Sequence, residues 1–314
     1  MYEVSWHTHQ INLWIALTKF QPTFSASLDD LGYECDVIED HLYLHDEDGE
    51  DVIHPDVVLT TEEDEHSIVV DCKSEEVSSD QIRRYLQLDE NEDQLVIQGL
   101  VSGPDPPISA ETALSSFSDL RSEDAPENIA LVHFDVSPQS GLAIWNLDNH
   151  EFDNPRLSDT FPINVQPSEP LPTGHYPFDI YEGDKEAMVS GVFSAVISLA
   201  MKQGEYSLEE VLDYAHPYWD KLGDQKQEEL LNRTEIIHLE LREAGLEQYL
   251  EKIAGTQGRE WRRTSGTIQA VHRETEYYVE HVLEDLPQAR LDHQAWSVES
   301  SDSGTESEAV DDDD

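Results

Sequence analysis

The sequence contains few of the features that would place a protein outside a reducing cell interior or in a membrane. It has only two cysteines, Cys35 and Cys72, in 314 residues, so no disulfide framework is indicated and a cytoplasmic location is expected. Its first residues lack the basic segment of a secretory signal peptide. The apolar stretch from Met188 to Met201 is too short for a membrane span and includes Ser190 and Gly191, so no membrane partner is expected.

Positive charge is also scarce. The chain has 18 Lys and Arg against 69 Asp and Glu, a formal net charge of −51 and an isoelectric point of about 4.2. This excess argues against general binding to nucleic acid, although it leaves room for a local basic site. The acids are dispersed among periodic apolar residues, which is typical of folded proteins from a high-salt cytoplasm. At about 1 M salt the screening length falls to roughly 3 Å, which weakens the repulsion between them.

Two further absences exclude other enzyme classes. The chain has no Gly-rich phosphate-binding loop and no Gly-x-Ser-x-Gly element.

The length of the chain predicts two domains rather than one. We expect an α/β domain over residues 1–150 and a mainly helical domain over residues 179–296. Residues 151–178, rich in proline, are a linker or an extended chain draped over the first domain. The tail of Ser, Asp and Glu over residues 297–314 is expected to be disordered.

Hydrophobic periodicity gives the elements of the first domain. Helices are predicted over residues 8–20, 24–31, 79–88 and 109–120, the second of them ending near Gly32. Strands are predicted over residues 33–38, 41–45, 51–59, 67–73, 94–101, 129–136 and 142–147. A mixed sheet flanked by helices follows from this order.

The second half of the chain changes to a helical pattern. Helices are predicted over residues 185–202, from Ser207 onwards, over 224–244 and over 268–286. Between the last two, residues 246–253 and 259–264 are predicted to form a hairpin with glycines in its turn.

Two apolar runs of the first domain carry the candidate catalytic residues. Asp56, after Pro55, stands at the head of one run, and Asp71 and Lys73 stand at the end of the next. Successive side chains of a strand point to opposite faces, so Asp71 and Lys73 are expected on one face while Cys72 points away. If the two runs pair as a hairpin, Asp56 lies beside Asp71. Two carboxylates and an ammonium then converge, as a Mg²⁺-dependent phosphodiester hydrolase requires.

These residues resemble the motif of the PD-(D/E)XK nuclease superfamily, which includes restriction endonucleases and Holliday-junction resolvases. Pro55-Asp56 matches the first half of the motif and Asp71-Cys72-Lys73 the second, and the second acid stands fifteen positions after the first. Gln81 and Tyr85 resemble the Gln-x-x-x-Tyr element that follows the lysine in many members. Over residues 8–147 the resemblance implies a restriction endonuclease-like mixed sheet flanked by helices.

The resemblance also implies a cofactor, Mg²⁺ or Mn²⁺, and roles for the matching residues. The carboxylates of Asp56 and Asp71 and the backbone carbonyl of Cys72 would hold the cation, because Mg²⁺ prefers oxygen ligands. Lys73 would orient or deprotonate the attacking water, or stabilise charge on the phosphate. Lysine is rare in this part of the chain, where Lys19 and Lys73 are the only basic residues among the first 82, and its position beside an acid is therefore informative.

The helix that follows adds candidate substrate contacts. Gln81 and Tyr85 lie four residues apart, so both are expected on the helix face next to the site. Arg83 or Arg84 would hold a phosphate.

The first predicted helix departs from the family pattern. Many members carry a Glu there as a third metal contact, but residues 8–20 contain no acid. His9, Gln10 and Asn12 are the polar candidates, and Glu3 lies upstream. Two interpretations stay open. The chain is a DNA endonuclease for restriction, repair or defence, or it is an inactive nuclease-like protein that binds DNA or has a regulatory role.

The predicted helical domain is similar to a winged helix, with three helices followed by a hairpin. By that resemblance the third helix would enter a DNA major groove and the wing would contact the backbone. Arg259, Trp261, Arg262 and Arg263 form the only concentrated basic patch, suited to phosphate contact and stacking. The third helix is nevertheless rich in glutamate, so contact with another protein is the alternative. DNA is the expected partner, and a homodimer is kept as an alternative to a monomer.

The histidines near the motif have a plainer interpretation. His7 and His9 could share a face, but no cysteine or acid beside them in the sequence completes a zinc site. His54 precedes the motif and would lie at its rim. We expect each of the three to be structural or exposed rather than a metal ligand.

Overall fold

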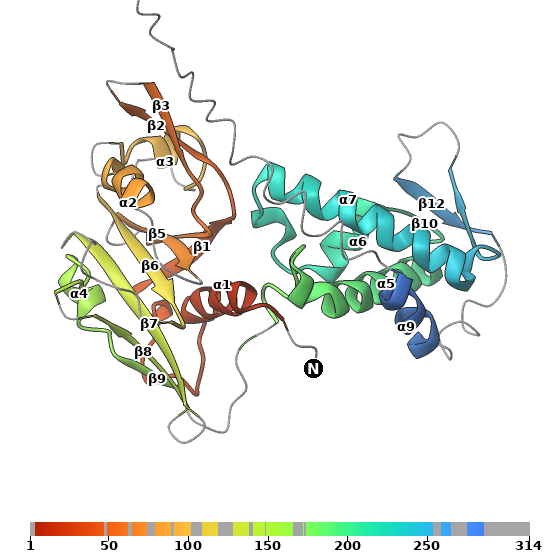
Figure 1. The fold of residues 1–314 in the computed structure, drawn as a ribbon, viewed down its shortest axis with the longest axis horizontal. Helices are drawn as coiled ribbons and strands as arrows, with labels where there is room; N and C mark the ends of the chain where they lie inside the picture. Colours follow the sequence, from red (N-terminus) through yellow and green to blue (C-terminus); the bar gives the residue numbers. More distant parts are fainter. Residues whose placement is uncertain are drawn as a thin grey trace, which may run out of the picture.

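The structure is a computed structural model in which the following residues are described: 4–46, 49–61, 65–73, 79–88, 91–101, 109–118, 128–137, 141–147, 149–165, 172, 174–253, 259–264 and 275–285. The expected acidic tail, residues 297–314, and the glycine turn at 254–258 lie outside these residues. Figure 1 shows a sheet with its helices at one end of the molecule, a helical part at the other, and the helix α1 between them.

A mixed sheet of seven strands organises the first part of the chain. Its order is β1-β4-β5-β6-β7-β8-β9. The strands span Tyr33–Ile38 (β1), Val57–Thr61 (β4), His66–Lys73 (β5), Ser109–Ser116 (β6), Ile129–Ser137 (β7), Gly141–Asn146 (β8) and Ile163–Val165 (β9). β1, β4 and β5 pair antiparallel, whereas β5, β6 and β7 run parallel, so β5 is hydrogen-bonded on both sides.

Helices cover both faces of this sheet. Side chains of α1 (Trp6–Leu17) join the core on one face, whereas those of α2 (Ser79–Leu86) and α3 (Gln94–Ile97) join the core on the other. The second face is extended by a separate hairpin of β2 (Leu42–Asp46) and β3 (Gly49–Ile53). Two short elements complete this part, the 3-10 turn η1 (Asp29–Leu31) and the helix α4 (Pro155–Ser158).

The helical part begins after a short 3-10 turn, η4 (Glu182–Asp184). Its long helices are α5 (Lys185–Lys202), α6 (Leu208–Ala215), α7 (Asp224–Leu241) and α9 (Thr275–Asp285), with the turn η5 (Trp219–Lys221) before α7 and a π-helical turn, η6 (Arg242–Leu246), after it. Ser207 begins α6 with a capping box, since its hydroxyl accepts from the Glu210 N–H and the Glu210 carboxylate accepts from the Ser207 N–H. A sheet ordered β10-β12-β11 closes this part, formed by β10 (Glu205–Ser207), β11 (Leu250–Lys252) and β12 (Glu260–Arg263).

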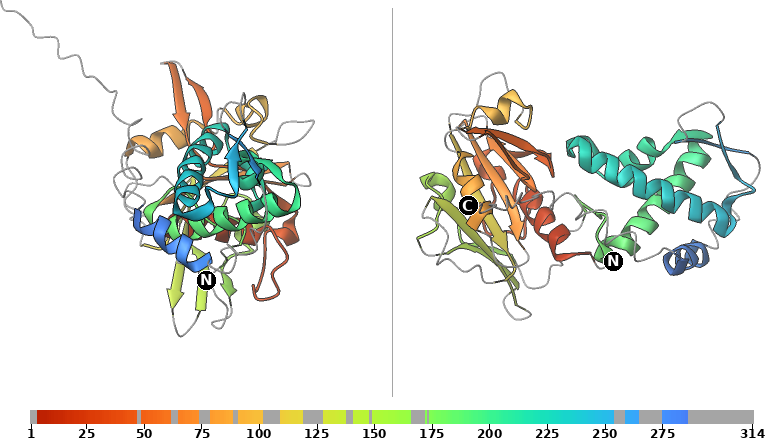
Figure 2. Two further views of the ribbon diagram at one scale, coloured as in Figure 1. Left: turned by 90° about the vertical axis from the view of Figure 1, so that its right-hand side faces the viewer. Right: turned by 45° about the horizontal axis from the view of Figure 1, so that its top comes forward.

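The two parts share one apolar core. A single cluster of buried side chains includes Ile11 of α1, Val70 of β5, Val192 of α5 and Leu212 of α6. The right-hand view of Figure 2 also shows the helical part next to α1. At that edge the Gly223 N–H donates to the Ile38 carbonyl over 3.0 Å, so backbone bonding continues from β1 into the helical part.

The general expectation of an α/β part followed by a helical part is confirmed. Several predicted elements are wrong. Residues 109–120 were expected as a helix, but β6 is a strand held between two parallel neighbours. Residues 94–101 were expected as a strand, but α3 is a helical turn there. The predicted helix at 24–31 is only the 3-10 turn at Asp29–Leu31.

The predicted strand at 51–59 is divided into β3 and β4. The break at His54–Asp56 sends β3 into the separate hairpin with β2, and it leaves Asp56 just before β4 rather than inside a strand. The sheet also extends past the expected boundary at residue 150, because β9 pairs antiparallel with β8. Within the described residues, no helix combines the length and the apolar character needed to cross a membrane.

Candidate functional site

Three acids form a row across neighbouring strands at one end of the sheet. Glu39 follows β1, Asp56 precedes β4 and Asp71 lies near the end of β5. The backbone continues the ladder through them, since the Glu39 N–H donates to the Asp56 carbonyl over 3.0 Å and the Asp56 N–H donates to the Val70 carbonyl over 2.8 Å. Antiparallel pairing of β4 with β5 therefore places Asp56 beside the end of β5 that carries Asp71.

Asp56 is fixed by hydrogen bonding and is mostly buried. Its Oδ2 accepts from the Cys72 N–H over 2.5 Å, and its Oδ1 lies 3.6 Å from the His7 Nε2. Burial raises the pKa of the Asp56 carboxyl to about 7. His7 opposes this shift, whereas the carboxylates of Asp71 and Glu39 add to it. A carboxylate whose charge is disfavoured by its neighbours is typical of sites that receive a cation.

Lys73 and Tyr85 both contact Asp71. The Lys73 ammonium and the Asp71 carboxylate form an ion pair on the same face of β5, and both side chains are largely buried. The Tyr85 hydroxyl, from α2, lies close to Asp71 and donates to the His54 carbonyl over 3.4 Å. Burial, together with the carboxylates of Asp71 and Asp56, raises the pKa of Tyr85 well above its ordinary value, so the hydroxyl stays protonated. Cys72 points to the opposite face and joins the core there.

His7 reaches the row of acids from the first turn of α1. The helix begins after Ser5, whose hydroxyl accepts from the Thr8 N–H over 3.1 Å and caps it. The His7 Nε2 lies 2.9 Å from the Glu39 carboxylate. Burial alone lowers the pKa of His7, but Asp56 and Glu39 more than offset it and raise the pKa to about 9. His7 is therefore an imidazolium at neutral pH.

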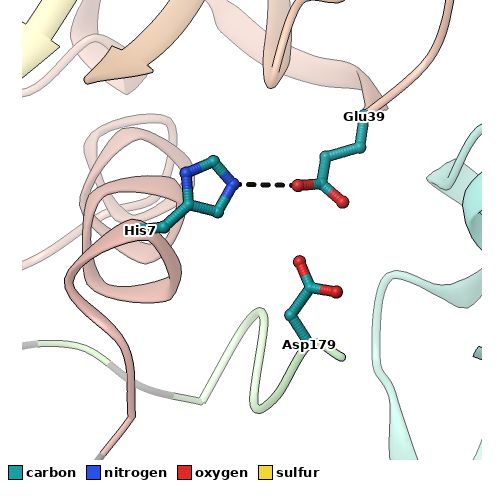
Figure 3. Close-up of side chains that lie close together, drawn as sticks. All are labelled: His7, Glu39 and Asp179. Atoms are coloured by element: carbon teal, nitrogen blue, oxygen red, sulfur yellow. Dashed lines mark hydrogen bonds and ion pairs between the residues drawn. The ribbon is translucent and has the colours of Figure 1, made fainter. Parts of the chain in front are cut away.

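A second group of charges extends the site into the helical part. Figure 3 shows His7, Glu39 and Asp179 facing one another from α1, from the end of β1 and from the segment before α5. Lys226 of α7 lies 2.5 Å from the Glu39 carboxylate and 3.1 Å from the Asp179 carboxylate. The Tyr176 hydroxyl donates to both acids over 3.0 Å. We call these five residues the seam network.

The seam network has the outline of a metal site, but its charges are already matched. Ligand atoms of His7, Glu39 and Asp179 lie within 4.8 Å of one another. The Lys226 ammonium, however, contacts both carboxylates, and its pKa is held well above the ordinary value by Asp179 and Glu39, against the effect of burial. A second cation there would meet this ammonium and the His7 imidazolium. The group is an ion-pair network rather than a metal centre.

The row at Asp56 and Asp71 is the second group whose donors suit a divalent cation. Its donors are hard carboxylate oxygens, which suit Mg²⁺ and Mn²⁺. Asp56 carries a pKa raised to about 7 by burial and by its acidic neighbours, and a divalent charge would relieve that repulsion. The residues that would hold the cation are Asp56, Asp71 and, by the resemblance, the backbone carbonyl of Cys72.

The structure thus brings together four of the predicted residues, Asp56, Asp71, Lys73 and Tyr85. Gln81 lies on the same helix as Tyr85, but its side chain is outside the described part. Arg83 is exposed and Arg84 is half-buried, with its Nη1 3.4 Å from the Val52 carbonyl.

The predicted basic patch of the helical part is largely neutralised. Arg259 donates to the Glu228 carboxylate over 2.6 Å, and Arg262 is paired with Glu251. Arg263 is exposed. Trp261 is only 1% exposed and lies in the core with its ring 4.2 Å from that of His238, which corrects the expectation of a ring open to nucleic acid. On β12 Trp261 is buried, whereas Glu260, Arg262 and Arg263 are exposed.

Sequence reasoning missed His7, Glu39, Asp179 and Lys226. His7 was expected to be structural or exposed, because no acid stands beside it in the sequence. Glu39 has one unusual property, a backbone φ of 50°, but this is visible only in the structure. Its partners come from α1, α7 and the segment before α5, so no sequence spacing marks them as a group.

Two matched families divide the chain close to the seam network. Residues 6–176 match the family described as the MJECL32 domain, and residues 181–294 match a domain of unknown function, DUF8601. The boundary between them falls in the segment that carries Asp179. No solved structure matches the chain.

One curated relative supports the first match. The uncharacterized protein MJECL32 of Methanocaldococcus jannaschii is 28% identical over 172 residues, which cover 51% of this chain. The chain spans only 38% of the length of that relative. Because the family match covers more than half of the sequence, the chain belongs to the MJECL32 domain family.

Proposed function

We propose that the chain is a metal-dependent endonuclease that hydrolyses phosphodiester bonds in DNA, with its active site at Asp56, Asp71 and Lys73. The observation that carries this proposal is the convergence of these three side chains at one end of β4 and β5, with the Tyr85 hydroxyl close to Asp71. Two carboxylates beside a lysine are the groups that such hydrolysis uses.

The order of elements around the site supports the same proposal. α1 precedes the antiparallel strands β1, β4 and β5, and α2 connects β5 to the parallel strand β6. This order supports the proposal, because the PD-(D/E)XK resemblance implies a mixed sheet flanked by helices. Asp56 lies just before β4, and Asp71 and Lys73 lie near the end of β5.

A bound divalent cation would supply charge neutralisation at the phosphate and a lower pKa for a nearby water. The chain's own residues do the remaining work. The Asp56 Oδ2 accepts from the Cys72 N–H, which leaves the Asp56 Oδ1 as the oxygen that would bind the cation. The Asp71 carboxylate is held by its ion pair with Lys73, and the Tyr85 hydroxyl lies close to it. The Lys73 ammonium then donates a hydrogen bond to a phosphate oxygen or to the attacking water and so stabilises the charge that develops there.

The helical part is proposed to have a winged-helix arrangement. Its elements run α5, β10, α6, α7, β11 and β12, and the last two strands form the hairpin expected for a wing. Its predicted DNA-contacting arginines, Arg259 and Arg262, are paired with acids, and Lys226 at the start of α7 is buried in the seam network. These contacts favour a role in packing against the catalytic part over a role in reading DNA.

The test is Mg²⁺- or Mn²⁺-dependent cleavage of linear, nicked and branched DNA in molar KCl. Asp71→Asn and Lys73→Met are expected to abolish cleavage while circular dichroism stays unchanged. Asp135→Asn is the matched control, because Asp135 is an exposed acid of the same sheet, on β7. Equal cleavage by wild type and by both site variants would remove the proposal.

One observation favours the alternative, an inactive nuclease-like protein that binds or regulates. α1 contributes an imidazolium, His7, where many relatives of the resembled family carry an acid, and Asp71 is already paired with Lys73. Calorimetric titration with Mn²⁺ separates the two functions. An inactive site is expected to bind no Mn²⁺, so the heat of titration should not change when Asp56 is substituted.

A further inference from the structure

An exposed tryptophan stands beside the proposed active site. Trp6, the first residue of α1, is 59% exposed. The Trp6 ring packs against two other rings. Its centroid lies 4.8 Å from the centroid of Phe117 and 5.6 Å from the centroid of His9, and both rings are tilted relative to it. Phe117 in turn lies 5.3 Å from the buried Phe134. The tryptophan is therefore braced on the core while most of its surface stays open to solvent.

Two contacts place this ring next to the end of β5. Gln10 lies one turn after Trp6 on the same side of α1, and its Nε2 donates to the Lys73 carbonyl over 3.0 Å. Phe117 directly follows Ser116, which pairs with Lys73 across the parallel strands β5 and β6. Gln10 and Ser116 thus both meet the backbone of Lys73. His7, the residue after Trp6, has its Nε2 3.6 Å from the Asp56 Oδ1, which places the first turn of α1 at the proposed active site.

The charge of the protein determines which part of a nucleic acid can bind there. With a net charge of −51 and 18 basic residues, the chain offers few contacts to phosphates, and such contacts weaken further at high salt. Stacking of a base on an aromatic ring is a contact with the base itself and neutralises no phosphate, so salt weakens this contact less than it weakens the phosphate contacts of the same single strand. The exposed Trp6 ring, close to the proposed active site, therefore offers a contact to nucleic acid that is not an ion pair with a phosphate.

On these observations we propose that Trp6 is a stacking platform for an unpaired nucleobase next to the scissile phosphate. The favoured substrate then has single-stranded character at this point, as in a free single strand, a flap or a junction, because a base inside a duplex has no free face to offer. The inference rests on the proposed nuclease function for the position of the phosphate, but base stacking on Trp6 can be measured without cleavage.

The experiment measures binding of a short oligothymidylate and of a blunt duplex by the full chain, in molar KCl without divalent cations. Trp6→Ala is expected to weaken binding of the single strand about tenfold, the usual size of one lost base–aromatic stack, and to change duplex binding less than about twofold. Trp6→Phe retains part of the affinity. The matched control is Phe20→Ala, which removes another exposed ring, 78% exposed and just after α1.

An abasic scan locates the stacked base. With the wild type, one abasic position in the oligonucleotide is expected to cost as much affinity as Trp6→Ala, and the variant should be insensitive to that position. If Trp6→Ala binds the single strand like the wild type, or if wild type binds no single strand, the inference fails. If stacking is observed but no DNA is cleaved with Mg²⁺, the inference stands and the proposed nuclease function fails.

Discussion

Lys226 on α7 places its ammonium 2.5 Å from the carboxylate of Glu39, which follows β1 and belongs to the row of acids at the sheet end. Through this one contact a residue of the helical part neutralises a charge of the α/β part. Glu39 in turn contacts His7, and His7 lies next to Asp56. The electrostatic environment of the proposed active site therefore depends on a residue from the second matched family segment.

Removal of Lys226 should destabilise the protein strongly. In Lys226→Met the buried carboxylates of Glu39 and Asp179 lose their shared counterion, and breaking a buried ion pair from one side costs about 3–5 kcal/mol. The double variant Lys226→Met/Glu39→Gln should recover part of this loss, because one uncompensated charge is also gone. Urea unfolding in molar KCl measures the free energy of unfolding of each variant.

Lys252→Met is the control for that comparison. Lys252 forms an ion pair with Glu235 at 3.8 Å, but its side chain is 47% exposed, and exposed pairs contribute about 0–1 kcal/mol. A loss at Lys226 no larger than the loss at Lys252 would show that the seam network does not hold the two parts together.

The charge of His7 predicts how stability depends on pH. Because Asp56 and Glu39 raise the pKa of His7 from 6.5 to about 9 against the effect of burial, the folded protein binds a proton that the unfolded chain releases between these values. The contribution is complete below about pH 6.5 and is lost as the pH rises through about 9. We expect the wild-type free energy of unfolding, measured with a chelator present, to fall over this window.

The variant His7→Gln isolates this contribution. Gln cannot titrate, so the difference in unfolding free energy between wild type and variant should shrink steadily from pH 6.5 to 9. A difference that stays constant over that range would mean that His7 is neutral in the folded protein, contrary to its contact with Glu39 at 2.9 Å.

Binding of Mn²⁺ should raise the melting temperature through Asp56. A ligand that binds only the folded state at about 100 times its dissociation constant stabilises that state by about 2.7 kcal/mol. We expect this gain in the wild type and its loss in Asp56→Asn, whose amide is a weaker ligand. Asp135→Asn should keep the gain. Thermal unfolding with and without Mn²⁺ checks the prediction, and equal gains in wild type and Asp56→Asn would contradict it.

The part of the site that could be predicted from sequence is the part built by one hairpin. Asp56 and Asp71 meet because β4 and β5 pair next to each other, and the two-residue alternation of a strand puts Lys73 on the same face as Asp71. Glu39 and Lys226 could not be found in this way. They meet only because α7 docks on the end of β1, a contact that no local periodicity encodes.

The strand β6 shows why local signals misled part of the fold prediction. Ser109, followed by Glu111 and Thr112, has the composition of a helix start, yet the segment pairs with β5 on one side and β7 on the other. Its small side chains let α1 pack closely, since the Trp14 Nε1 donates to the Ser115 hydroxyl over 3.0 Å. Hydrogen bonds to two neighbours outweigh a weak intrinsic preference for helix.

Gly223, which precedes α7, offers a direct test of the contact between the two parts. Its N–H donates to the Ile38 carbonyl, and a Cβ at this position would lie 2.7 Å from the Glu39 carbonyl oxygen and 2.7 Å from the Asp40 carboxylate. Gly223→Ala must therefore push α7 away from β1, which costs about 1–3 kcal/mol. It should also weaken the contact between Lys226 and Glu39.

Gly174→Ala provides the control for this substitution, because a Cβ there meets nothing within 4 Å, and a change of less than about 0.5 kcal/mol is expected. The two alanine variants are compared by urea unfolding and by Mn²⁺ affinity. If the seam network tunes the row of acids, Gly223→Ala changes the affinity for Mn²⁺ as well as the stability, since Glu39 moves relative to His7 and Asp56. If Gly223→Ala lowers the stability but leaves the affinity for Mn²⁺ unchanged, the seam network only holds the two parts together and does not influence the row of acids.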